Sequence, residues 1–63
     1  MIKVTGLNHK ELYLNEDNIE KIEKVPETLI TLSNGKKYIV LETTKEVIDK
    51  IIEFKRKIFT VDL

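Results

Sequence analysis

The sequence predicts an α+β fold, with a small antiparallel sheet of four to five strands followed by one C-terminal amphipathic helix. Residues 1–41 are divided into short, largely apolar runs separated by polar turns, which is typical of a meander of hairpins. Residues 43–58 carry a capping box and apolar residues at helical spacing. We expect a single domain over residues 1–63, with strands within 1–41, a helix over about 44–58 and a tail at 59–63.

The N-terminal segment predicts a hairpin with two possible registers. A two-residue turn would leave apolar and polar side chains mixed on both faces. A three-residue loop with a bulge pairs Val4 with Leu12. It also pairs Ile2 with Leu14, so that one face of the hairpin is apolar, and burial favours this register. It requires a left-handed backbone at His9, which would then be a structural turn residue.

The next segment is ambiguous between helix and strand. Ile19, Ile22 and Val25 recur every three residues, which fits one face of a helix better than a strand. The run is short and stops at Pro26, and the residue before a proline favours extended backbone. We therefore predict a turn near residues 16–19 and then a strand to Val25.

Asn34-Gly35 predicts a second hairpin, between residues 28–33 and 36–41. Asn34 and Gly35 are expected to supply the positive φ angles of a tight turn. Both strands carry apolar residues on both faces, whereas a sheet with one covered face shows cleaner alternation. This hairpin should therefore be central in the sheet, or its second face should meet another chain.

A helix should begin after Thr43. Thr43 and Glu46 have the spacing of a capping box, in which each side chain binds the other residue's amide. The apolar stripe that follows is widened by three further apolar residues, and its main members are Val47, Ile51, Phe54 and Ile58.

The composition excludes several kinds of chemistry. The chain has 63 residues, no Cys and one His, which excludes disulfides, thiolate metal sites and His-rich metal sites. His9 could act as a base or a ligand, but no other nucleophile or His is placed to work with it. The carboxylates alternate with lysines on faces that should be exposed to solvent. We expect no catalytic residue, no metal and no cofactor, and therefore a protein that is not an enzyme.

Two basic segments are candidate partner-binding residues: Lys36, Lys37 and Tyr38 in the second hairpin, and Lys55, Arg56 and Lys57 near the helix end. Such residues contact either nucleic acid or an acidic protein surface. The 11 Lys and Arg are balanced by 11 Asp and Glu. Nucleic-acid binding normally uses a basic excess, so a protein partner is favoured over an RNA- or DNA-binding regulator.

Small size favours self-association. A chain this short buries only about 60% of its unfolded surface, and small scaffolds often gain stability by forming oligomers. The apolar positions exceed what one small core needs. We expect a homo-oligomer, a dimer in the simplest case, and the candidate self-association residues are Leu29, Phe59, Val61 and Leu63.

Nothing in the sequence indicates secretion or insertion into a membrane. Met1 leads directly into an alternating pattern rather than a signal peptide. No apolar run approaches the roughly 20 residues that span a bilayer. We therefore expect a soluble cytoplasmic protein.

Several short motifs occur in a fixed order along the chain: Met1-Ile2-Lys3-Val4-Thr5, Leu7-Asn8, Pro26-Glu27-Thr28, Ile30-Thr31-Leu32-Ser33-Asn34-Gly35-Lys36-Lys37-Tyr38-Ile39-Val40 and Ile51-Ile52-Glu53-Phe54-Lys55-Arg56. Mainly on these motifs, the chain resembles the FlbD/SwrD family of small flagellar and swarming-motility proteins, from Met1 to about Ile58. The family usually has Gly after Asn8, where this chain has His9.

The resemblance implies a cytoplasmic protein near the flagellar base that is not an enzyme. It implies a role in motility through protein binding, in support of stator function and motor torque, with flagellar motor or stator components as partners. It transfers no catalytic or cofactor residues to this chain.

Overall fold

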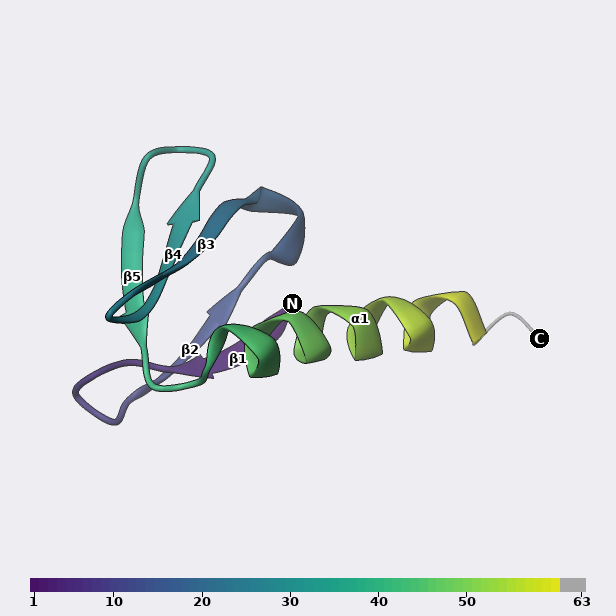
Figure 1. Ribbon diagram of the computed structural model, residues 1–63. Helices are drawn as coiled ribbons and strands as arrows, with labels where there is room; N and C mark the ends of the chain where they lie inside the picture. Colours follow the sequence, from purple (N-terminus) through teal and green to yellow (C-terminus); the bar gives the residue numbers. More distant parts are fainter. Residues whose placement is uncertain (61–63) are drawn as a thin grey trace.

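The described part of the chain forms five antiparallel strands followed by one helix, which confirms the α+β class (Figure 1). This computed structural model describes the backbone of residues 1–60 and the side chains of residues 1–58. A 3-10 turn, η1 (Glu16–Asn18), precedes β3. The remaining elements are β1 (Ile2–Thr5), β2 (Glu11–Leu14), β3 (Ile19–Val25), β4 (Glu27–Leu32), β5 (Lys37–Val40) and α1 (Thr44–Thr60).

The strands are divided between two small sheets rather than lying in one. β1 pairs with β2, and β4 lies between β3 and β5. An antiparallel bridge between Gly6 and Val40 joins β5 to the end of β1. The strands therefore follow the spatial order β3-β4-β5-β1-β2, so the second hairpin is central in this order.

The register of the first hairpin is the predicted one, with Val4 opposite Leu12 and Ile2 opposite Leu14. His9 has a φ of 64°, so the left-handed turn residue is confirmed. Gly6 N donates to Lys10 O (2.9 Å) and His9 N donates to Gly6 O (2.9 Å), which closes a three-residue loop.

The second hairpin uses the same loop. Leu32 N donates to Lys36 O (2.8 Å) and Gly35 N donates to Leu32 O (2.9 Å). The prediction of a positive φ at Asn34 is wrong: among the described residues only His9 and Gly35 have one. In a three-residue loop of this kind only the last residue is left-handed. Asn34 instead accepts a hydrogen bond from Lys36 N through its side chain (3.0 Å), as Asn8 does from Lys10 N.

Residues 19–25 form a strand, as predicted, and a bulge explains their helix-like spacing. The β3–β4 register shifts between Ile19 and Lys21. The extra residue changes which side of the strand its neighbours face. Ile19 and Ile22 can therefore both pack against the core although they are three residues apart.

The core lies where the two sheets and α1 meet. Six apolar side chains are buried there, and further apolar residues of α1, including Ile51 and Phe54, pack against them. Buried residues come from β1, β2, β4, β5 and α1, so no single element has a core of its own. The six are Ile2, Val4, Leu14, Ile30, Val40 and Val47.

The predicted capping box starts α1. Glu46 N donates to Thr43 Oγ1 (3.1 Å), and Thr43 N donates to Glu46 Oε1 (2.8 Å). The helix continues to Thr60, slightly past the expected end near Ile58, so residues 59 and 60 of the predicted tail are helical. In Figure 1 the C-terminal turns of α1 extend past the two sheets.

Gly35→Ala is expected to lower the free energy of unfolding by about 1–2 kcal/mol, because a Cβ disfavours a φ of 88°. No heavy atom lies within 4 Å of the added Cβ, so the cost is conformational and not steric. His9→Gly should not destabilise the chain, since it removes the same penalty. Urea denaturation followed by circular dichroism measures both. The control Ser33→Ala changes an exposed residue of the same turn, and an equal cost for both alanine variants would contradict this account.

Candidate protein-binding surface

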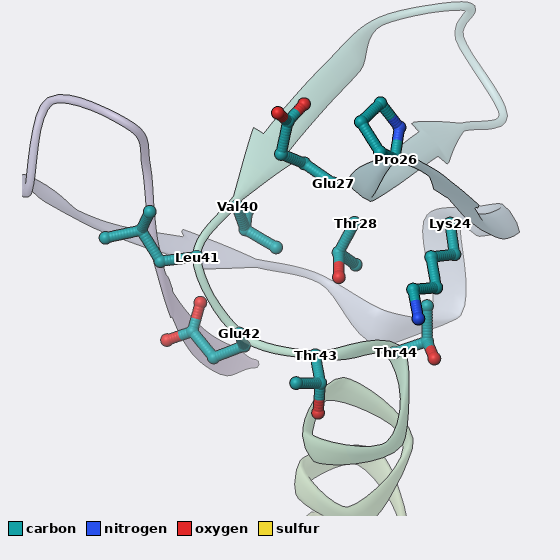
Figure 2. Close-up of a pocket in the computed structure, with 9 residues that line it drawn as sticks. All are labelled: Lys24, Pro26, Glu27, Thr28, Val40, Leu41, Glu42, Thr43 and Thr44. Atoms are coloured by element: carbon teal, nitrogen blue, oxygen red, sulfur yellow. The ribbon is translucent and has the colours of Figure 1, made fainter.

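Four apolar side chains gather on the face of the sheets opposite the core. The β4–β5 register places Leu29 opposite Ile39. The Gly6–Val40 bridge aligns Leu7 with Ile39 from the other side. Successive strand residues point to opposite faces, and Figure 2 shows the buried Val40 and its neighbour Leu41 pointing in opposite directions. We name Leu7, Leu29, Ile39 and Leu41 the outer-face patch.

The outer-face patch is open to solvent. Leu7 is 53% exposed, Leu41 46% and Ile39 41%, while Leu29 is half-buried. Scattered exposed apolar residues are normal in soluble proteins, whereas neighbouring ones on one face make that face a candidate interaction site. The patch explains the two-sided apolar pattern of the second hairpin: one face fills the core and the other is left uncovered among the described residues.

A short junction between the sheets holds the outer-face patch together. Leu41 N donates to Thr5 O (2.8 Å), which continues the contact made by the Gly6–Val40 bridge. Glu42 then binds Thr5 with both carboxylate oxygens. Thr5 N donates to Oε1 (2.8 Å), and the Thr5 hydroxyl donates to Oε2 (2.9 Å). We name this pair of hydrogen bonds the Thr5–Glu42 clamp.

The clamp favours the ionised form of Glu42. Burial by itself raises the pKa of the Glu42 carboxyl, because a charge is costly to remove from water. Hydrogen bonds from the Thr5 amide, the Glu42 amide and the Thr5 hydroxyl, together with the positive charge of Lys50, outweigh burial. The pKa of Glu42 therefore lies below its ordinary value of about 4.5.

Lys37 of the second hairpin lies beside the outer-face patch, but Tyr38 does not. Lys36 and Lys37 are exposed where β5 leaves the turn. Lys37 is two residues before Ile39 on the same strand, so both side chains are on the outer face. Tyr38 is half-buried and packs against the core, and its ring therefore faces away from Lys37.

The basic residues of α1 are elsewhere. Figure 1 shows the β4–β5 turn and the C-terminal part of α1 well apart, so the structure does not bring the two basic segments into one surface. Lys55 points back towards η1, where its Nζ lies 2.7 Å from Asp17 Oδ1 and 3.7 Å from Glu16 Oε2. The hydrogen bond to Asp17 is the main reason why the pKa of Lys55 is raised.

Glu16 is a buried acid that the sequence analysis did not single out. Its Oε1 lies 3.1 Å from the N-terminal nitrogen of Met1. The hydrogen bond from its own amide lowers the pKa of the Glu16 carboxyl, burial opposes this, and the terminal charge adds to the lowering. This ion-pair group fastens α1 to η1 across 38 residues of sequence, and no local pattern indicates such a contact.

Of the four candidate self-association residues, Leu29 is the one whose side chain lies in the described part of the chain. Leu29 belongs to the outer-face patch, whereas the side chain of Phe59 and the residues Val61 and Leu63 lie outside the described part of the chain.

A cleft of about 240 Å³ lies between the β3–β4 turn, the end of β5 and the start of α1 (Figure 2). Ligand pockets usually have about 300–1,000 Å³, so this cleft is small for a cofactor. Within the described residues, no group of three or more His, Cys, Asp or Glu is placed to hold a metal ion. None of the helical segments described has the length and apolar character needed to cross a membrane.

Comparison with known proteins identifies the family. A family model described as FlbD, flagellar and swarming motility proteins, matches residues 1–59. The chain belongs to the FlbD family. The resemblance seen in the sequence is therefore confirmed. Comparison with curated proteins and with solved structures found no match.

Removing the charge of the Thr5–Glu42 clamp should destabilise this FlbD-family chain. Because the folded pKa of Glu42 is lowered, its stabilisation is present above the unfolded value of about 4.5 and is lost as the pH falls through the folded pKa. Glu42→Gln should lower the free energy of unfolding by about 1–2 kcal/mol at neutral pH. The difference from wild type should shrink below about pH 4.5.

Urea denaturation at a series of pH values measures this difference. Glu53→Gln, at an exposed position of α1, serves as the matched control and should change stability by less than about 0.5 kcal/mol. A Glu42→Gln effect that is independent of pH, or equal to that of the control, would show that the clamp has no charge-dependent role.

Proposed function

We propose that this chain is a flagellar motility accessory that is not an enzyme and that acts by binding another protein through the outer-face patch. Membership of the FlbD family supports the motility role. The outer-face patch is the single structural observation that supports protein binding, because it leaves neighbouring apolar side chains exposed. We place this action on the cytoplasmic side of the flagellar base, in support of stator function and motor torque.

The geometry of the patch defines the kind of partner. Protein interfaces combine an apolar centre with a polar rim. Ile39 is central, between Leu29 and Leu7, and Lys37 lies along the same strand at the border. A matching partner would present apolar anchors to these side chains and an acidic group to Lys37. We propose a motor or stator component with such a surface as that partner.

Self-association is part of the proposal as well. The small core shared among five elements supports it, since a chain of this size gains stability when an exposed surface is covered. The RNA- or DNA-binding alternative lacks comparable support. The lysines that would contact the nucleic acid are distributed between separate parts of the fold, and Lys55 is already paired with acidic groups.

The proposal predicts a torque defect from substitutions in the outer-face patch. Deleting the gene should lower motor torque without lowering the number of stators, and wild-type protein should restore it. The double variant Leu7→Ser/Ile39→Ser should fail to restore torque, because it removes the exposed anchors without entering the core. Rotation of tethered cells, combined with counting of labelled stators, measures both quantities.

Ile52→Ser is the matched control for the patch variant. Ile52 is 46% exposed, a fraction similar to the 41% of Ile39, but it lies on α1 away from the patch. This variant should restore torque fully, and immunoblots should show equal amounts of each protein. Normal torque after deletion would refute the motility role, whereas normal torque in the patch variant would refute only the proposed surface.

A further inference from the structure

The β3 strand has an unpaired edge. It is the terminal strand of its sheet, paired with β4 on one side, and no described strand lies on the other. An open strand edge presents a row of unpaired N–H and C=O groups and can pair with a strand of another chain. Charged residues on an edge normally discourage pairing, so the charge pattern of β3 decides whether a second strand fits.

The hydrogen-bond pattern determines which backbone groups of β3 point outward. Residues of an antiparallel strand alternate between facing one neighbour and facing the other. The hydrogen bond from Leu32 N to Lys36 O shows that even-numbered residues of β4 face β5, so odd-numbered ones face β3. The register pairs these with odd-numbered residues of β3 beyond the bulge. The N–H and C=O groups of Ile22 and Lys24 therefore point outward.

The sequence of β3 is complementary to itself when two copies pair antiparallel about Ile22. Ile22 then faces Ile22 of the second copy, and their outward backbone groups meet. Lys21 faces Glu23 of the second copy, and Glu20 faces Lys24, so that every charged position meets the opposite charge. Opposite charges directly across a strand pair stabilise it, and like charges destabilise it.

Neighbouring registers do not pair opposite charges in this way. A shift by one residue would set outward backbone groups against inward ones, so no hydrogen bonds would form. A shift by two brings either Lys21 opposite Lys21 or Glu23 opposite Glu23 of the second copy. The intrastrand contact between Lys21 and Glu23 is long (3.9 Å), and its lysine is exposed, so exchanging it for a contact between copies costs little.

We propose that the chain forms a homodimer in which the β3 strands of two copies pair antiparallel about Ile22. The β3-β4-β5 sheet of one copy and that of the second copy then form one continuous sheet across the two-fold axis. The half-buried Ile22 side chains meet on the core side of the sheet, which extends the apolar core of each copy. This interface uses backbone hydrogen bonds and differs from the outer-face patch, so it stands independently of the proposed motility role.

Two charge-reversal variants test the interface. Lys21→Glu and Glu23→Lys each create like-charge contacts across the dimer, so each alone should have a dissociation constant raised about tenfold or more. An equal mixture of the two should associate as wild type, because each copy then meets the opposite charges. Sedimentation from micromolar to millimolar concentration distinguishes dimer from the 7.4 kDa monomer.

The controls separate local pairing from overall charge. Lys10→Glu and Glu53→Lys make the same changes in net charge at exposed positions outside β3. Each of these alone should dimerise as wild type. Hydrogen exchange of the wild-type protein gives a measurement without substitutions: the amides of Ile22 and Lys24 should become more protected as concentration rises.

Three outcomes would overturn the proposal. They are a wild-type monomer at every concentration, dimerisation of Lys21→Glu that equals wild type, or protection of the Ile22 and Lys24 amides that does not depend on concentration. A monomer would remove this interface without changing the expected torque result for the outer-face patch.

Discussion

The fold depends on the junction between its two small sheets. A two-stranded hairpin such as β1–β2 is marginal on its own in water, and the three-stranded sheet also needs a cover. The Gly6–Val40 bridge and the Thr5–Glu42 clamp bring the two sheets together. Only then can residues of both sheets and Val47 of α1 share one buried cluster, because none of these elements has enough apolar surface alone.

The same junction creates the surface that we propose as the binding surface. It places Leu7 beside Ile39, although they belong to different sheets. The inner face of the second hairpin packs in the core. The apolar residues on the outer face of this hairpin are not covered by any other described element. Exposed apolar side chains that lie together on one face are a surface through which a protein can bind another protein.

The two proposed interfaces use different physical forces. The outer-face patch would bind through apolar side chains, whose contribution depends on the area removed from water. The β3 edge would bind through backbone hydrogen bonds, and its charges would select the register. Since one is a sheet face and the other a strand edge, a dimer formed at β3 would leave the patch of each copy available to a motility partner.

The sequence by itself determined the local features of this protein. The left-handed His9 and Gly35 and the Thr43–Glu46 capping box follow from sterics and hydrogen bonds between residues close in the chain. The register of the first hairpin follows from the alternation of its apolar residues, since only this register places them on one face. Tertiary structure alone decided the division into two sheets, the outer-face patch and the Thr5–Glu42 clamp. The clamp joins residues 37 positions apart, and such contacts depend on the path of the whole chain, which no local pattern encodes.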